Sequence, residues 1–287
     1  MESSPPLVTI GIPTYNRSTQ LLRAITSAQK QTYNHIEIIV SDNGSTDDTE
    51  AMCRELANHD QRIQFFRQPT NLGGTGNFNW VLSMARGSYF MWLGDDDWIE
   101  SNYVESCLNI LHQDAALALV SGLPVYCNAG VHKYGGRIFD ADHVDARHRI
   151  TRFLFKVTDN GAFYGVFRKD AISDLQLSDK FAGDWYFVCD ALISGTFRMT
   201  VDTHIHRELG GATESYKRLT KLYSLPWIAR LIPSIYAARS FKQHLIESKR
   251  FQSLQLGFFR STWLFVIILT RPLTNIPYRL KRKLSLS

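Results

Sequence analysis

Long apolar runs are scarce in this sequence of 287 residues. The most apolar run, Trp263 to Leu269, is far shorter than the roughly 20 apolar residues that a membrane-spanning helix needs. The first residues also lack the basic start, apolar stretch and cleavage site of a secretory signal peptide. We therefore expect a cytoplasmic protein without a spanning helix.

Cysteine is also rare, and no CxxC pair is present among Cys53, Cys107, Cys127 and Cys189. This wide spacing argues against a disulfide framework and against a zinc site, and it predicts buried thiols in a reducing compartment. The glycines of residues 73–76 do not follow a first strand as GxGxxG, so a dinucleotide site is not expected either.

The charge of the chain is moderate but unevenly distributed. Hydrophobic residues make up 44% and charged residues 21%, which is typical of a globular protein, and the net charge is +5. No acidic residue follows Glu247, whereas the end of the chain contains Arg271, Arg279, Lys281, Arg282 and Lys283. Aromatic residues interleaved with basic ones are not evident elsewhere, so we expect an anionic membrane surface as partner, not a nucleic acid.

The first hundred residues alternate short β-branched or aromatic runs with segments of helical periodicity. Strands are predicted at Leu7–Ile12, His35–Val40, Ile63–Phe66 and Tyr89–Leu93. A glycine-rich loop, in which Asn77 or Asn79 caps the next helix, is predicted before the last of them. This order is typical of an α/β protein with a mostly parallel sheet and helices on both faces.

Polar motifs follow three of these strands, at the sheet edge where such folds bind ligands. They are PTYNR at 13–17, SDNGS at 41–45 and GDDDW at 94–98. Adjacent carboxylates such as Asp95, Asp96 and Asp97 repel one another unless they face solvent or share a divalent cation. The alternative is a solvated loop with a helix cap at Asp97.

The motifs IPTYNR, SDNGSTDDT, NLGGTGNFN and WLGDDDW, in this order, resemble a family 2 glycosyltransferase of the GT-A fold, of the bacterial cell-surface polysaccharide type. The resemblance covers residues 7 to about 100. It implies transfer of a sugar from a nucleotide-diphospho-sugar, with inversion at the anomeric carbon and usually with Mg²⁺ or Mn²⁺. The chain departs from the family's LDxDD pattern at Gly94, where the first aspartate is expected.

The resemblance also implies roles for individual residues. For the donor, it implies Pro13, Thr14 and Tyr15 at the base, Asp42 as acceptor of a hydrogen bond from the base, and Arg17 near the phosphates. Asp95 would lie beside the ribose, with Gly74 and Asn77 near the donor. The metal-binding residues of the DXD-like motif would be Asp95, Asp96 and Asp97, with Asp96 as direct ligand. Two alternatives stay open: an Asx-turn at Asp42 and simple packing at Tyr15.

Beyond residue 100 the motifs are weaker. Residues 128–150 predict a hairpin and a loop, and residues 161–172 a strand and a helix start. In GDW, the resemblance makes Asp184 the general base that takes the proton of the acceptor hydroxyl, and the alternative is a helix cap. His204, His206 or Arg207 are candidates to complete the metal or diphosphate site.

These observations predict a GT-A catalytic domain at 1–212, with a donor-binding half at about 1–100 and an acceptor half at about 101–212. A helical, membrane-associating region follows at 213–287, although its apolar run could pack on the domain instead. We expect a metal-dependent inverting glycosyltransferase, peripheral at the inner face of the cell membrane, with a lipid-linked or polysaccharide acceptor. The alternatives are a nucleotidyltransferase on a similar sheet and a non-catalytic nucleotide-sugar binding module.

Overall fold

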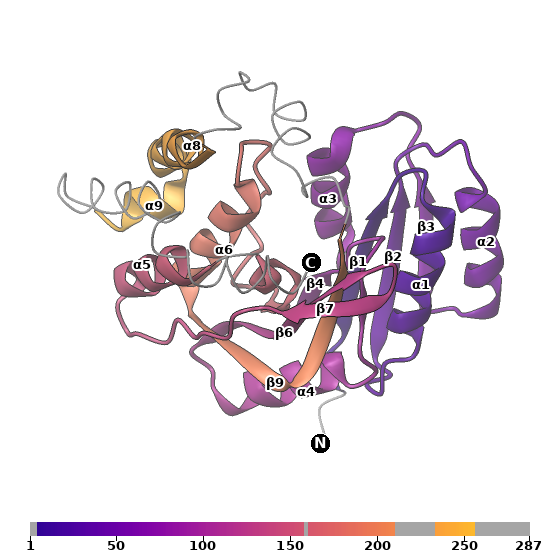
Figure 1. Cartoon of the computed structure of the whole chain (residues 1–287), viewed down its shortest axis with the longest axis horizontal. Coiled ribbons are helices and arrows are strands. Elements are labelled where there is room, and N and C mark those ends of the chain that lie inside the picture. The colour runs from indigo at the N-terminus through magenta and orange to yellow at the C-terminus, as the bar shows by residue number, and fades with distance from the viewer. Residues whose placement is uncertain (1–4, 158–159, 210–232, 256–287) are drawn as a thin grey trace.

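The computed structural model describes residues 5–157, 160–209 and 233–255, and it is an α/β protein (Figure 1). The N-terminal part alternates strands and helices. Its elements are β1 (Val8–Thr14), α1 (Ser18–Gln29), β2 (Ile36–Asp42), α2 (Thr49–His59), β3 (Ile63–Arg67), α3 (Gly73–Met84) and β4 (Tyr89–Trp92). The predicted fold class and the predicted order of these elements are confirmed.

The C-terminal part is less regular. Its elements are β5 (Trp98–Ile99), α4 (Tyr103–Gln113), β6 (Leu117–Asn128), β7 (Val131–Gly135), α5 (Ala146–Lys156), the 3-10 helix η1 (Gly161–Tyr164), β8 (Val166–Arg168), α6 (Gly183–Ser194), β9 (Thr196–Glu208), α8 (Pro233–Glu247) and α9 (Lys249–Ser253). The predicted hairpin is β6–β7, but α5 was not expected in the loop after it.

The strands of the described residues form one mixed sheet, in the order β3-β2-β1-β4-β8-β6-β9-β5, with β7 paired to β6. Strands β1 to β4 run parallel to one another, while β8 runs antiparallel to β4 and β6. The chain winds from β1 outward to β3 and then returns to the other side of β1 as β4. The direction of winding therefore reverses between β1 and β4, which is where open α/β sheets bind ligands.

Two hydrophobic layers cover the sheet, because neighbouring strand residues point to opposite faces. Val8, Ile10 and Ile12 of β1 pack with α1, α2 and α4, whereas the other face is covered by α3, α5, α6, α8 and α9. Gly11 allows α3 to approach β1 closely, since a Cβ there would lie 2.2 Å from Val81 Cγ1. Figure 1 shows α1 and α2 on one side of the molecule and α5, α6, α8 and α9 on the other.

One local prediction, the cap of α3 by Asn77 or Asn79, and one alternative, the helix cap at Asp97, are wrong. Helix α3 already begins at Gly73, so Asn77 and Asn79 lie inside it and do not cap it. Its first amides are bound instead by Asn43, which accepts from Leu72 N, and by Asn71, which accepts from Gly73 N. Asp97 precedes the strand β5, so the helix cap considered for it is not formed.

Helices α8 and α9, the described portion of the region predicted at 213–287, pack on α6. The hydroxyl of Tyr186 donates to the Ala237 carbonyl over 2.8 Å, and Asp190 binds His244 Nε2 at 2.8 Å and Ser248 Oγ at 2.7 Å. The apolar run Trp263 to Leu269 lies outside the described residues. No helix among the described residues is long and apolar enough to cross a membrane.

The cysteines agree with expectation. Cys53, Cys107, Cys127 and Cys189 are all buried free thiols. Burial raises the pKa of each of them, to about 12 for Cys53.

Candidate active site

Asp95 and Asp96 follow β4 and face residues that follow β1, at the point where the winding of the sheet reverses. Asp95 accepts a hydrogen bond from Thr14 Oγ1 at 2.9 Å, and Arg17 Nη1 binds Asp95 at 3.1 Å and Asp96 at 2.5 Å. Arg17 is the last residue of PTYNR, so two of the predicted motifs meet here. One guanidinium nitrogen thus lies between two carboxylates, both of them mostly shielded from solvent.

The electrostatics at Asp95 favour a cation. Burial raises its pKa to about 6, and the neighbouring Asp96 adds to the rise, while Arg17 and hydrogen bonds from Thr14 and the Tyr15 amide oppose it. Among the described residues, no three His, Cys, Asp or Glu side chains gather as a metal site. Mg²⁺ commonly uses only one or two carboxylates together with substrate phosphates, so the oxygens of Asp95 and Asp96 fit a hard divalent cation.

Asp97 is placed differently from its two neighbours. Its carboxylate is fully buried in contact with β9, accepting from the Glu208 amide at 3.0 Å and from Arg207 Nε at 3.3 Å. Burial raises its pKa, with a further contribution from Asp96, and Arg207 opposes the rise. Asp97 therefore joins the acidic motif to β9, whereas Arg17 contacts the other two aspartates.

The departure at Gly94 has a steric reason. A Cβ at this position would lie 2.9 Å from Asp97 Oδ2 and 3.3 Å from Asp96 Oδ1. An aspartate here would press a third charge against Asp96 and Asp97, so glycine suits the turn that this chain forms.

Asp184 lies in the first turn of α6, near the same arginine that binds Asp97. The residue at the N-cap position is Ala182, and the structure gives Asp184 a hydrogen bond from Asn160 Nδ2 at 3.0 Å. Burial raises the pKa of Asp184, while Asn160 and the charge of Arg207 oppose the rise. A carboxyl that is desolvated but still within reach of a positive charge is suited to proton abstraction.

Arg207, which the sequence named only as a candidate for the metal or diphosphate site, contacts Asp97 and acts by its charge on Asp184. Its guanidinium lies 4.4 Å from the ring centroid of Tyr164, 3.4 Å from the Tyr164 hydroxyl at the nearest nitrogen, and against Asp97. The charges of Asp96, Asp97 and Asp184 all act on the pKa of Tyr164. Arg207 and Tyr164 therefore lie close enough to the acidic motif and to Asp184 for their charges to act on one another.

The predicted base-binding residues lie at the ends of β1 and β2. Pro13 is buried, and Tyr15 is 44% exposed. Asp42 forms the Asx-turn considered as its alternative, because Oδ1 accepts from the Ser45 amide at 2.9 Å. Its Oδ2 is buried and has no hydrogen-bond partner among the described residues, so the turn uses only half of this carboxylate.

Gly74 and Asn77, predicted together near the donor, occupy different environments. Gly74 is exposed and has open space where a side chain would be. Asn77 is buried and joins the ends of two strands, accepting from Ser41 Oγ at 2.6 Å and donating to the carbonyls of Ser41 and Thr14 at 2.9 and 3.4 Å. Asn77 thus holds the loops that carry Thr14 and Asp42.

A cleft of about 570 Å³ lies between the first turn of α3 and the segment that precedes Asp184. It is lined by Leu72, Gly73, Gly74, Thr75, Gly76, Asn79, Gln176, Leu177, Ser178 and Asp179. Asn79 fixes its walls, because its side chain exchanges two hydrogen bonds with the backbone of Leu177, at 2.7 and 2.9 Å. A Cβ on Gly183 would lie 2.1 Å from the Ser178 carbonyl, so the cleft wall packs directly against the residue before Asp184.

The two histidines of β9 face away from Arg207, since alternate strand residues point to opposite sides. His204 Nδ1 lies 3.1 Å from Glu100, and His206 stacks on Trp98 with ring centroids 5.0 Å apart. Neither contacts Asp95 or Asp96 in the described structure.

Sequence reasoning missed Arg23, Asn160 and Tyr164. Arg23 of α1 donates to the Asp96 carbonyl at 2.6 Å and stacks on Trp98 with its guanidinium carbon 3.8 Å from the ring centroid. For Arg23 there was a signal in the sequence, namely a charged residue within an apolar stretch of helical periodicity. Asn160 and Tyr164 have no comparable local signal, since only the fold brings them beside Asp184 and Arg207.

A family model now agrees with this geometry: the model described as Glycosyl transferase family 2 matches residues 9–176, more than half of the chain. The chain belongs to glycosyl transferase family 2. The GT-A resemblance stated from four motifs is thereby confirmed, and the match extends well beyond the first hundred residues that carried it. The nucleotidyltransferase and binding-module alternatives are not favoured by it.

Three curated relatives of this family 2 member are bacterial proteins. A GalNAc(5)-diNAcBac-PP-undecaprenol beta-1,3-glucosyltransferase of Campylobacter jejuni is 30% identical over 183 residues, which are 62% of this chain and 57% of that protein. Chondroitin synthase of Escherichia coli is 40% identical over 40% of this chain and 17% of its own length. Glycosyltransferase GlyG of Streptococcus pneumoniae is 26% identical over 67% of this chain and 56% of its own length. The chain therefore matches at most about 57% of these relatives.

Solved structures show the same fold at low sequence identity. TarS residues 1–349 of S. aureus in complex with UDP superposes with a TM-score of 0.59 and 17% identity, covering 97% of this transferase and 88% of that chain. The mannosyltransferase PcManGT from Pyrobaculum calidifontis, in complex with GDP-Man and Mn²⁺, gives a TM-score of 0.58 and 15% identity, covering 98% of this chain and 74% of the other.

Proposed function

We propose that this glycosyltransferase moves a sugar from a nucleotide-diphospho-sugar to a hydroxyl of a lipid-linked or polysaccharide glycan, with inversion at the anomeric carbon and with Mg²⁺ or Mn²⁺. The observation that carries the proposal is the pairing of two features. Arg17 Nη1 lies between Asp95 and Asp96 just after β4, and Arg207, which binds Asp97, acts by its charge on Asp184.

The donor would bind along the ends of β1 and β2. The buried, unpartnered Oδ2 of Asp42 is available to accept from an N–H of the base, and the exposed ring of Tyr15 can lie against it. Arg17 is close enough to Asp95 and Asp96 to turn from these carboxylates to the diphosphate.

Asp95 and Asp96 would hold the metal ion, which when bound supplies positive charge at the diphosphate leaving group. Asp97 would support these two ligands from the side of β9, because its carboxylate is bound to the Glu208 amide and the Arg207 side chain. The Mn²⁺ complex of PcManGT supports a divalent metal in this fold.

In the reaction, the acceptor oxygen attacks the anomeric carbon as the bond from that carbon to the diphosphate oxygen breaks. Asp184 takes the proton of the attacking hydroxyl, and a single displacement inverts the configuration. Arg207 would hold Asp184 ionised by its charge and fix Asp97 at the same time.

An acceptor on a lipid is supported by the undecaprenol-linked substrate in the name of the Campylobacter jejuni relative. The same proposal includes an anionic membrane surface as partner, at the inner face of the cell membrane. It also includes a role for residues 213–287 in reaching that surface.

Two measurements test the proposal. Thermal melting with UDP, GDP or dTDP, each with and without Mn²⁺, should give the largest rise in melting temperature for one nucleotide together with the metal. Proton NMR of the transfer product should show the anomeric configuration opposite to that of the donor. Retention of configuration, or stabilisation by nucleotide without any effect of Mn²⁺, would contradict inversion or metal use, respectively.

A further inference from the structure

The outer face of α5 combines basic and apolar side chains in a way that the active site does not explain. His148, Arg152 and Phe155 follow one another at spacings of four and three residues, so they lie on one face of this helix. Phe155 is 42% exposed, and Ile138 in the preceding segment is 52% exposed. The opposite face is buried, with Ile150, Phe153 and Leu154 in the hydrophobic core.

Three cations gather at the C-terminal end of this helix. The charge of Arg137 is the main cause that lowers the pKa of Lys156, and Arg152 lowers it further. Lys156 Nζ also lies 5.8 Å from the ring centroid of Phe155, so the exposed aromatic ring and the charges form one surface. A cluster of like charges attracts molecules or surfaces of the opposite charge.

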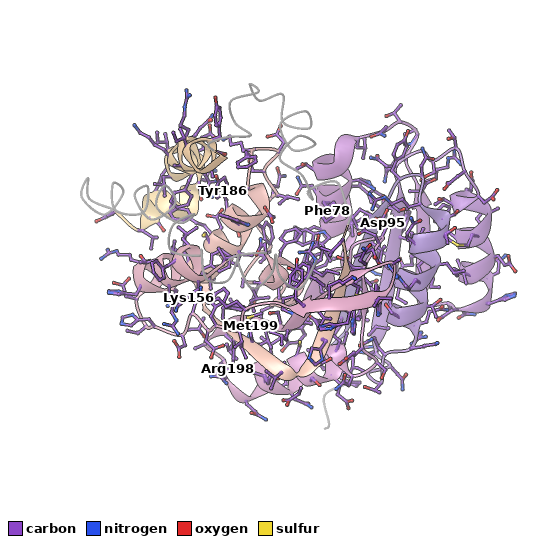
Figure 2. The ribbon with its side chains drawn as sticks, in the orientation of Figure 1. Phe78, Asp95, Lys156, Tyr186, Arg198 and Met199 are labelled. Carbon is purple, nitrogen blue, oxygen red and sulfur yellow. The ribbon has the colours of Figure 1, made fainter. Side chains whose placement is uncertain are left out.

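Three acidic residues near α5 in the sequence are at its other end or already bound, and a fourth, Asp159, lies outside the described residues. Asp145 caps the start of α5 and lies 3.5 Å from His148, and Asp142 precedes it. The carboxylate of Asp140 accepts from the Met199 amide at 2.9 Å. Figure 2 shows Lys156 on the side of the molecule away from α1 and α2.

The path of the chain leads from this helix toward the basic end of the sequence. Arg147 of α5 donates to the carbonyl of Leu254 at 3.1 Å, one residue before the described structure ends at 255. The following 32 residues, 256–287, contain the most apolar run of the chain and five of its basic residues in the last 17. The described structure therefore ends beside α5, at the point in the sequence where this composition begins.

We propose that Arg137, Ile138, Arg152, Phe155 and Lys156, here called the α5 basic face, contact an anionic lipid surface directly. Exposed aromatic and aliphatic side chains surrounded by Lys and Arg match the two components of interfacial binding, apolar insertion and attraction to anionic headgroups. The proposal rests on the membrane association included in the proposed function, but not on the transfer reaction.

The contact would place the base-bearing helix near the lipid. Arg149, on the inner side of α5, donates to the carbonyls of Leu192 and Ile193 at the end of α6, at 2.8 and 3.2 Å. The α5 basic face is on the outer side of α5, and the inner side of α5 packs on α6. The first turn of α6 carries Asp184, the proposed base.

The test uses the full chain and vesicles of phosphatidylcholine with or without phosphatidylglycerol. Neutralising two cations with Arg152→Gln and Lys156→Gln should weaken binding to the anionic vesicles about 30-fold, since each Lys or Arg contributes about 1 kcal/mol there and 1.4 kcal/mol is a factor of ten. The matched control is Lys30→Gln with Arg54→Gln, which removes two exposed cations from the N-terminal part and should change binding much less.

A second readout locates the contact itself. Tryptophan fluorescence of Phe155→Trp should be quenched by brominated phosphatidylcholine in anionic vesicles beyond the quenching of the unsubstituted chain, whereas that of Leu22→Trp should not. Melting curves and nucleotide binding should be unchanged in all variants, which separates this proposal from the chemistry of the site.

Three outcomes overturn the proposal: equal binding by the α5 variant and the wild type, quenching of Leu22→Trp but not of Phe155→Trp, or failure of the wild type to bind anionic vesicles at all. A dimer in sedimentation that dissociates on Phe155→Ser would assign the α5 basic face to a second copy of the chain instead. Inverting transfer to a soluble acceptor, measured in parallel, reports on the proposed function whatever the vesicles show.

Discussion

The two parts of the molecule hold their loops with different residues. In the N-terminal part, short amide side chains do this: Asn43 and Asn71 bind the start of α3, and Asn77 joins the ends of β1 and β2. In the C-terminal part, arginines bind backbone carbonyls across long stretches of chain. Arg149 reaches His143, Val144, Leu192 and Ile193, and Arg168 reaches Leu111, Asp114 and Leu117.

This difference decides what can be read from the sequence. The asparagines lie in the motifs SDNGSTDDT and NLGGTGNFN, which the sequence shows, although the residues that Asn43 and Asn77 bind are 29 to 63 positions away. An arginine outside such motifs gives no comparable signal until the fold supplies its acceptors. Long-range arginine contacts are therefore invisible in a sequence, even where they determine the position of a helix such as α5.

The largest effect should come from the acidic motif of the N-terminal part. Asp96→Asn should lower the transfer rate by about three orders of magnitude or more, because removing a metal ligand costs several kcal/mol of transition-state stabilisation. Initial rates at saturating Mn²⁺ and melting with nucleotide and Mn²⁺ measure this. Asp48→Asn, an exposed change with no side-chain capping bond to lose, is the control. Normal rates in Asp96→Asn would remove this residue from the site.

A similarly large but purely kinetic effect is expected in the C-terminal part. Asp184→Asn should lower kcat by about 10² to 10⁴ while nucleotide binding is preserved, since only proton abstraction is lost. Asp170→Asn, an exposed change after β8 and outside the described cleft, should leave kcat unchanged. Loss of nucleotide binding together with kcat would mean that Asp184 has a structural role.

The pH dependence refines that assignment. Because burial raises the pKa of Asp184, kcat/KM should fall with decreasing pH at a higher pH than an ordinary aspartate would give. Asn160→Ala removes a hydrogen bond that opposes the rise, so this acid limb should move to still higher pH. A pH–rate profile in which Asn160→Ala leaves the limb in place, or moves it down, would exclude Asp184 as the titrating base.

The comparison between amides and arginines gives a stability prediction. Arg149→Leu should lower the free energy of unfolding by about 2–4 kcal/mol, because it breaks one buried and three partly buried hydrogen bonds to backbone carbonyls. Asn43→Ala should cost about 1–2 kcal/mol, as for the loss of a helix cap. Denaturant unfolding of both variants measures the difference, and a larger loss for Asn43→Ala would reverse the comparison.

The smallest effect concerns acid stability at the end of α2. Arg62 hydrogen-bonds to Asp60 and lowers its pKa to about 2. A depressed folded pKa stabilises the protein above the ordinary aspartate pKa, and this contribution disappears as the pH falls from about 4 towards 2. Asp60→Asn should therefore lose about 1–2 kcal/mol at neutral pH and show a flatter acid dependence of unfolding. An unchanged acid profile would show that this pair contributes nothing.

Much of the N-terminal part was predictable from the sequence. Strands β1 to β4 are buried apolar runs, and each extends at most two residues beyond its prediction at the carboxyl end. Thr14, Arg17, Asp95 and Asp96 were named from motifs, and the structure brings all four into contact. Parallel strands place their carboxyl ends together, so motif order alone was enough to predict this cluster.

The C-terminal part was predicted less well for a physical reason. Strand β9 runs from Thr196 to Glu208, and it pairs with β6 through a register shift before pairing with β5. Its alternation determines that Arg207 faces Asp97 while His204 and His206 face Glu100. From the sequence, His204, His206 and Arg207 were equivalent candidates for the metal or diphosphate site, because only the strand pairing determines which side of β9 faces the site.

The four buried cysteines have a practical consequence for following how the molecule opens. An alkylating reagent reacts with the thiolate, and burial suppresses the thiolate at Cys53 of α2 as well as at Cys107, Cys127 and Cys189 in the C-terminal part. Each thiol can be modified only after its own surroundings have opened. Mass spectrometry of peptides after timed alkylation would therefore read out, in the unmodified chain, the order in which the two parts come apart.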